Sequence, residues 1–213
     1  MAKALIFDTE TTGLSTESSK VLEFAYMLLD HETGNVEHDV MYFNTDEEVP
    51  VAASRVNGLT RAKLGSLSSG LYFDERLEEM REVFHKADIL VGHNIKSYDI
   101  PLMMSNFRMY GQSLSKLPDG KEKVWQTYDT MLHAKDLVPR AQHKAHSGGR
   151  SVYYGPKLVT TYAWICKVAY GKTASDMDAI FNTTYSTQGC AHEALYDVWM
   201  SFVAYKGLLA LNA

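Results

Sequence analysis

Hydrophobic residues occur along this chain of 213 residues in short runs that are separated by turn-forming residues. Five of these runs predict strands, at 3–8, 21–30, 36–44, 88–92 and 124–130. A short polar turn at 31–35 separates the second run from the third, so the first three strands are expected to form an antiparallel meander.

Between and after these runs, apolar residues recur at helical spacing. The segments that are predicted to be helices are 73–87, 100–110, 157–171, 174–182 and 192–209. The segments 50–60 and 133–156 are predicted to be loops because they are polar and rich in turn-forming residues. Three antiparallel strands followed by alternating helices and strands predict a mixed α/β sheet flanked by helices, in a single domain that covers residues 1–213.

The composition is that of an ordinary soluble globular protein, with 46% hydrophobic and 22% charged residues. Because no run of about eighteen apolar residues occurs, no membrane span is expected. The N-terminus lacks the basic and apolar regions of a signal peptide. Cys166 and Cys190 are too few for a disulfide framework, so we expect reduced thiols and a cytoplasmic protein.

The net charge of −5 argues weakly against a polyanionic partner, because nucleic-acid-binding proteins usually have a basic surface. The charge is unevenly distributed, however. Residues 1–50 contain eleven acidic residues and two lysines, whereas residues 135–157 contain five basic residues and one acidic residue. This asymmetry predicts an acidic centre with a basic rim.

Two carboxylates, Asp8 and Glu10, lie at the end of the first predicted strand in the sequence FDTETTGL. Residues i and i+2 of a strand point to the same side, so these carboxylates are expected to leave the strand together. Two carboxylates at this spacing repel each other, and a bound cation removes that cost. Mg²⁺ and Mn²⁺ prefer oxygen ligands, so the pair suggests half of a metal site. The alternative is a pair of solvated acids at a strand end.

Two further carboxylates lie at the start of one predicted helix and within another. Asp99 follows the strand at 88–92 in GHNIKSYDIPL, where α/β folds place their sites, although an acid at a helix N-terminus is also favoured by the helix dipole. Asp197 lies in HEALYDV within the last predicted helix, five residues after His192. By itself, Asp197 is equally compatible with a solvated helix face.

In combination, the strings FDTETTGL, GHNIKSYDIPLM and HEALYDV resemble the three motifs of the DEDDh (DnaQ-like) 3′–5′ exonucleases, which belong to the ribonuclease H-like superfamily. The sequences VNGLT and YDTMLHAKDL also resemble segments of this family. The resemblance implies a ribonuclease H-like mixed sheet. It further implies that two divalent metal ions, Mg²⁺ or Mn²⁺, are held by Asp8, Glu10, Asp99 and Asp197. His192 is then the general base, because a neutral imidazole can take a proton from water near neutral pH.

The same resemblance suggests which residues grip the substrate. Thr11 and Thr12 are expected to approach the 3′-terminal nucleotide through backbone groups, while Leu14 and Leu59 pack against the last bases. For the two leucines, simple core packing is the alternative. The residues expected to support the site and the penultimate nucleotide are Asn94 and Tyr98, of which Asn94 could instead have a purely structural hydrogen bond.

The basic segment has no assigned family role. Arg140, Lys144 and Arg150 are candidates for contacts with backbone phosphates, and the alternative is a solvated loop. A metal cluster formed by His133, His143 and His146 is a weaker alternative, because no cysteine or acid completes a recognisable spacing.

These observations predict a metal-dependent 3′–5′ exonuclease that releases nucleoside 5′-monophosphates from single-stranded or frayed 3′ ends. DNA is favoured, because FDTETTGL resembles the DNA-directed members, which include the proofreading subunit of a bacterial replicative polymerase. Since the chain ends soon after the last predicted helix, we expect a stand-alone nuclease, with a polymerase or a second copy as open alternatives for a partner. The rival functions are RNA trimming, as in ribonuclease T or oligoribonuclease, and an inactive nucleic-acid-binding domain.

Overall fold

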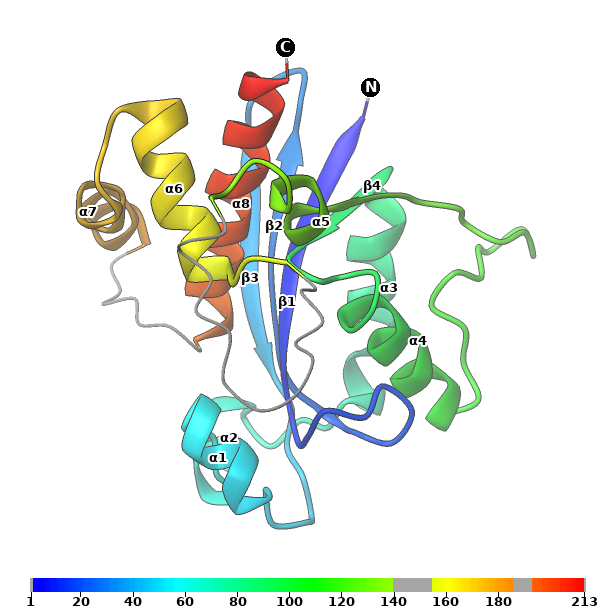
Figure 1. The fold of residues 1–213 in the computed structure, drawn as a ribbon. Coiled ribbons are helices and arrows are strands. Elements are labelled where there is room, and N and C mark those ends of the chain that lie inside the picture. The colour runs from blue at the N-terminus through cyan, green and yellow to red at the C-terminus, as the bar shows by residue number, and fades with distance from the viewer. Residues whose placement is uncertain (1, 140–154, 186–192, 213) are drawn as a thin grey trace, which may run out of the picture.

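The computed structural model describes residues 2–139, 155–185 and 193–212, and the statements below concern these residues. A five-stranded mixed sheet forms the centre of the fold, with the strand order β3-β2-β1-β4-β5 (Figure 1). The central strand, β1, pairs antiparallel with β2 and parallel with β4. The strands are β1 (Lys3–Thr11), β2 (Val21–Asp30), β3 (Val36–Tyr42), β4 (Ile89–Gly92) and β5 (Gln126–Asp129).

Helices cover both faces of the sheet (Figure 1). One face carries α5 (Thr130–Ala134), α6 (Leu158–Tyr170), α7 (Ala174–Tyr185) and α8 (Ala194–Leu211). The opposite face carries the 3₁₀ turn η1 (Asp74–Arg76), α3 (Leu77–Lys86) and α4 (Asp99–Met109). Two short helices, α1 (Val51–Asn57) and α2 (Arg61–Leu67), lie at the end of the sheet where β1 finishes.

Strand β1 is central because its side chains alternate between two apolar cores. Ala4 and Ile6 belong to the core beneath α8, whereas Leu5 and Phe7 belong to the core beneath α3 and α4. Strands that are buried on both faces are expected to be apolar throughout, as this one is from Ala4 to Phe7. The alternation continues beyond Phe7, so the next even-numbered residue, Asp8, emerges on the α8 face.

Helix α8 is the most apolar helix of the described residues. Its eighteen residues have a mean hydropathy of 1.2, which by length and composition would suffice to cross a membrane. In the fold, however, 56% of this stretch is buried, and α8 packs against β1, β2 and α6. Its hydrophobicity is therefore accounted for by its position between the sheet and the outer helices.

The predicted mixed sheet and its five strands are confirmed, and the long helices lie within a few residues of the predicted ranges. The prediction of a loop at 50–60 is wrong, because α1 forms there, and α2 follows it directly. Helix α1 has no buried residue and α2 buries only Leu64, so neither carries the apolar periodicity that reveals a helix. The loop predicted at 133–156 begins within α5, and its residues 140–154 lie outside the described residues.

Candidate functional site

Three of the predicted carboxylates meet on the α8 face of the sheet. Asp8 and Glu10 leave β1 on this side, and Asp197 lies in the first turn of α8, which crosses the strand. One carboxylate oxygen from each of these residues lies within 4.8 Å of the other two. A register shift in the pairing of β1 with β2 falls between Glu10 and Thr11, a feature that often re-aims side chains beside active sites.

The fourth predicted carboxylate, Asp99, reaches the end of the sheet from the opposite face. It begins α4, is only 4% exposed, and accepts a hydrogen bond of 2.7 Å at Oδ1 from the Thr9 hydroxyl. Thr9 lies between Asp8 and Glu10 on β1, so this bond fixes Asp99 beside the cluster. The negative charge of Asp99 contributes to the raised pKa of Asp8.

Burial and mutual repulsion make this cluster costly to ionise. Burial, followed by the charges of Asp99 and Asp197, raises the pKa of Asp8 well above its usual value. Burial also raises the pKa of Glu10 to about 8 and that of Asp99 to about 7. A divalent cation bound among these oxygens would remove the repulsion, and the all-carboxylate donor set suits Mg²⁺ or Mn²⁺. The described residues therefore fit a site for hard divalent cations.

A fifth carboxylate, Glu23, was not anticipated. It lies on β2 directly opposite Glu10, is 4% exposed, and hydrogen-bonds with the Tyr42 side chain and the Ala194 backbone. Burial raises its pKa to about 7. Because the hydrogen bond to Ala194 joins β2 to the first residue of α8, Glu23 helps to fix the helix that carries Asp197.

A cavity of about 430 Å³ opens beside Glu10. Four of the predicted nucleotide contacts line this cavity, namely Thr11, Thr12, Leu14 and Tyr98. Its other wall consists of small apolar residues of α1, namely Ala52, Ala53 and Val56, which the sequence did not single out. Leu14 is 91% exposed, so it offers an apolar surface to a ligand rather than to the core.

Hydrogen bonds fix the segment 11–13, which lines this cavity. The Tyr98 hydroxyl donates to the Gly13 carbonyl at 2.6 Å and lies 2.8 Å from the Thr11 hydroxyl. The Thr12 hydroxyl accepts from the Lys20 backbone N–H at 2.9 Å. The Thr11 hydroxyl is therefore engaged within the protein. The Thr12 hydroxyl only accepts in its bond from Lys20, so its O–H can still donate to a ligand.

The loop that leads to Asp99 is held by another buried carboxylate, Asp129. It accepts hydrogen bonds from the backbone N–H groups of Asn94 at 3.0 Å and Lys96 at 3.3 Å. It also caps α5 by accepting from the first backbone N–H groups of that helix. Asn94 adopts a left-handed φ of 65°, which fits the structural alternative considered for this residue.

Comparison with known proteins identifies the family. The family model named RNase_T, described as an exonuclease, matches residues 5–147 of the chain. The chain belongs to the RNase_T exonuclease family. This match includes Asp8, Glu10 and Asp99 of the site.

Among curated proteins, PolC-type DNA polymerase III enzymes are similar to this exonuclease-family chain. The enzyme of Mycoplasma pneumoniae is 31% identical over 109 residues, which are 51% of this chain and 7% of that protein. The enzyme of Pediococcus pentosaceus is 31% identical over 137 residues, which are 64% of this chain and 9% of that protein. The chain thus corresponds to a small part of these much longer polymerases.

Among solved structures, E. coli exonuclease I has the same fold as this exonuclease-family chain. Its complex with a dT13 oligonucleotide gives a TM-score of 0.65 at 17% identity, covering 98% of this chain and 41% of that one. The zinc-bound form of its complex with single-stranded DNA gives a TM-score of 0.63 at 17% identity, with 98% and 40% covered.

The remaining predicted site residues are either placed away from the cavity or lie outside the described residues. Leu59 is 2% exposed and packs in a small core with Leu22, Val49 and Leu64, which is the core-packing role considered for it. His133 stacks on Tyr128 with ring centroids 3.8 Å apart. Five predicted residues lie outside the described residues, namely Arg140, His143, Lys144, His146 and Arg150, and so does His192.

Proposed function

We propose that this protein is a metal-dependent 3′–5′ exonuclease that hydrolyses the terminal phosphodiester of single-stranded or frayed DNA and releases nucleoside 5′-monophosphates. One observation carries the proposal: three carboxylates lie within 4.8 Å of one another beside a cavity of about 430 Å³ in a member of an exonuclease family. Carboxylates at this spacing suit phosphodiester hydrolysis, because they can hold cations next to the phosphate, where cations stabilise the charge that develops in the reaction.

Asp8, Glu10 and Asp197 would hold the divalent ions, two Mg²⁺ or Mn²⁺, and Asp99 would complete the ligand set from the other side of β1. When bound, such ions stabilise negative charge on the phosphate and lower the pKa of coordinated water. The chain itself positions these ligands on a buried strand and on the first turn of a helix, which are rigid elements. Their geometry is thereby set before substrate binds.

His192 is our candidate for the general base, and its sequence position supports this role. It precedes Ala194, the first residue of α8, and Asp197 lies one turn further along. A neutral imidazole close to the phosphate would accept the proton of the attacking water.

The cavity supports a nucleotide as the ligand. Its walls are mainly small and apolar, as Ala52, Ala53 and Val56 face the exposed Leu14. A flat base can pack against such surfaces without sequence-specific hydrogen bonds, which suits an enzyme that removes any terminal nucleotide. Single-stranded DNA is favoured because exonuclease I, which has this fold, is found with dT13 and dA16 oligonucleotides. The PolC-type relatives support a DNA polymerase as a partner.

Matched DNA and RNA oligonucleotides with a 5′ label would test this proposal. In Mg²⁺ or Mn²⁺, we expect a ladder of products that shorten from the 3′ end, with DNA degraded faster than RNA and no products in EDTA. Asp8→Ala protein serves as the control for contaminating nucleases. Products of the opposite polarity, or hydrolysis that persists in EDTA, would contradict the proposal, while faster degradation of RNA would assign the chain to RNA trimming.

A further inference from the structure

The segment 12–20, which joins β1 to β2, is a loop that closes on itself at its two ends. The Thr12 backbone N–H donates to the Lys20 carbonyl at 3.0 Å, and the Lys20 N–H donates to the Thr12 hydroxyl at 2.9 Å. Leu14 belongs to this loop, is 91% exposed and lines the cavity beside Glu10. Because the loop 12–20 contains no strand or helix, the position of Leu14 depends on contacts between the loop and its neighbours.

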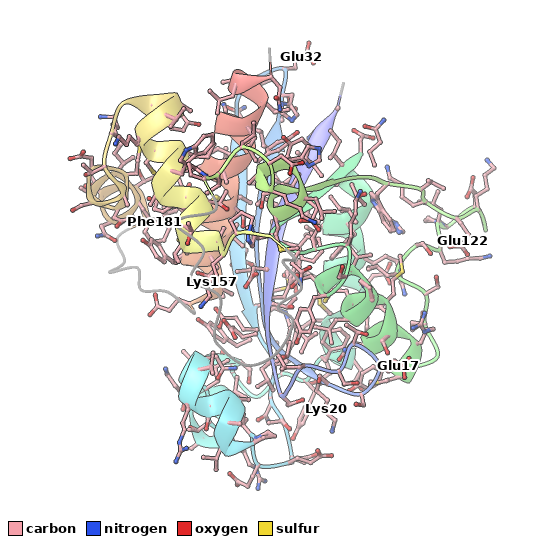
Figure 2. The ribbon with its side chains drawn as sticks, in the orientation of Figure 1. Glu17, Lys20, Glu32, Glu122, Lys157 and Phe181 are labelled. Atoms are coloured by element: carbon pink, nitrogen blue, oxygen red, sulfur yellow. The ribbon has the colours of Figure 1, made fainter. Side chains whose placement is uncertain are left out.

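Helix α4 holds the loop 12–20 through two adjacent buried side chains. The Ser105 hydroxyl donates to the Glu17 carbonyl at 3.1 Å, and the Asn106 amide nitrogen donates to the Ser19 carbonyl at 3.0 Å. The Asn106 amide oxygen accepts from the backbone N–H of Val21, the first residue of β2, at 3.1 Å. Figure 1 shows the loop beside α4, and Figure 2 shows Glu17 there.

The orientation of the Asn106 amide is determined by its partners. A primary amide offers one acceptor oxygen and one nitrogen with two N–H donors. The carbonyls of Ser19 and Leu102 can only accept and face the nitrogen, whereas the Val21 N–H can only donate and faces the oxygen. A flipped amide would lose all three hydrogen bonds. Because Asn106 is only 2% exposed, it acts on a ligand only through the segments that it holds.

Helix α4 is itself fixed beside the carboxylate cluster. It begins with Asp99, whose Oδ1 accepts a hydrogen bond of 2.7 Å from the Thr9 hydroxyl on β1. Directly before it, the Tyr98 hydroxyl donates at 2.6 Å to the carbonyl of Gly13, the neighbour of Leu14 in the chain. The loop is therefore held next to Leu14 and again further along by a helix that is anchored to the carboxylate-bearing strand. Since rigid elements place side chains precisely, this arrangement sets the position of Leu14 relative to the carboxylates.

We propose that Ser105 and Asn106 are positioning residues, which hold the loop 12–20 on α4 and thereby keep Leu14 at the cavity in the place where it packs against the terminal base. The inference rests on the proposed exonuclease function and deepens it, because it assigns a role in substrate binding to two buried side chains that do not line the cavity.

The affinity for single-stranded DNA tests this role. The dissociation constant of an oligonucleotide with a 5′ fluorescein label is measured by fluorescence anisotropy in Ca²⁺. Ser105→Ala removes one hydrogen bond to the loop and should raise this constant about 2- to 10-fold. Asn106→Ala removes the contacts with Ser19 and Val21 and should raise it about 5- to 100-fold. In Mg²⁺, KM should rise with the dissociation constant while kcat stays within about two-fold of wild type, because a base contact is made equally in the ground and transition states.

Leu14→Ala shows whether the two residues act through Leu14. In L14A protein the contact with the terminal base is already lost. Adding N106A or S105A to L14A should therefore raise the dissociation constant by less than about two-fold, since residues that act through one contact are not additive. A merely structural role of Ser105 and Asn106 would produce the same factor with and without Leu14.

Ser113→Ala and Asn44→Ala are the matched controls. The Ser113 hydroxyl lies 3.1 Å from the Ser115 hydroxyl. Asn44 accepts from the Thr45 backbone N–H at 3.0 Å and donates to the Gly70 carbonyl at 3.4 Å. None of these contacts reaches the loop 12–20, so both variants should bind the oligonucleotide as the wild type does.

Two outcomes would overturn the role of Ser105 and Asn106. One is wild-type affinity in folded S105A and N106A proteins, and the other is an equal effect of these substitutions with and without Leu14. If N106A protein does not fold, S105A with and without L14A decides the question. Wild-type protein that binds the oligonucleotide without hydrolysing it in Mg²⁺ would refute the proposed function alone, and the comparison of dissociation constants would still test the two residues. Absence of binding to the wild type would refute both.

Discussion

Glu23 provides a direct test of the electrostatics beneath the carboxylate cluster. It is buried on β2 opposite Glu10, and its carboxylate hydrogen-bonds with Tyr42 and with the backbone of Ala194. In Glu23→Gln protein, the amide oxygen can still accept from the Ala194 N–H, and the amide nitrogen can donate to the Tyr42 hydroxyl. The substitution therefore removes the charge and leaves the local hydrogen bonds in place.

The expected magnitude follows from the raised pKa. Burial moves the pKa of Glu23 from its usual 4.5 to about 7, so the folded state holds this proton more tightly than the unfolded state does. That contribution to stability is fully present below pH 4.5 and is lost as the pH rises through 7. At 1.36 kcal/mol per pH unit, the wild type should lose about 2–3 kcal/mol between pH 5 and pH 8 through this residue. Glutamine cannot ionise, so E23Q protein should not show that part of the loss.

Urea unfolding in EDTA at several pH values from 5 to 8 would measure the effect, with tryptophan fluorescence as the signal. The informative quantity is the difference in unfolding free energy between E23Q and wild type, which should rise by about 2–3 kcal/mol across this range. Glu32→Gln is the matched control, because Glu32 is exposed on the β2–β3 turn at the opposite end of the sheet from α1 (Figure 2). Parallel pH profiles for E23Q and wild type would refute the reasoning.

The remaining predictions concern the catalytic and basic residues. Asp8→Ala should abolish hydrolysis in Mg²⁺, while the melting temperature in EDTA holds or rises because like-charge repulsion is relieved; retained hydrolysis would show that the metal-site assignment is wrong. His192→Ala should slow single-turnover hydrolysis by about 10²–10⁴ without changing Mn²⁺ affinity, and an unchanged rate would remove it from the mechanism. Changing Arg140, Lys144 and Arg150 together to alanine should flatten the salt dependence of oligonucleotide binding by up to about two units, and parallel slopes would leave them without a phosphate contact.

Local patterns in the sequence predicted the parts of the site that depend on a single element. The period-two alternation of β1 places Asp8 and Glu10 on one face, and the structure has them there. The proximity of Asp197 depends instead on how α8 packs across β1, which no local pattern contains. That residue was predicted only through the resemblance of HEALYDV to a family motif.

The sequence did not reveal roles that depend on how deeply a residue is buried in the folded structure. Leu59 is apolar, so its sequence position suited a base contact and core packing equally, and only its 2% exposure distinguishes them. Helix α1 was missed because a helix without buried residues has no apolar face to detect. Glu23 did leave a signal, because it is the only acid in the apolar run VLEFAYMLL at 21–29, where an isolated buried charge suggests a specific role.

The acidic centre also bears on how a protein with a net charge of −5 can bind a polyanion. Without cations, the carboxylates of Asp8, Glu10 and Asp197 would repel a phosphate placed beside them. Burial, together with repulsion from the neighbouring carboxylates, already raises the pKa of Asp8. A divalent cation between carboxylates and phosphate turns both repulsions into attractions. Metal binding and binding of the nucleic-acid end should therefore reinforce each other, because each removes the electrostatic cost that the other meets. An acidic site of this kind binds a phosphate only together with divalent cations. A basic site would bind a phosphate without them.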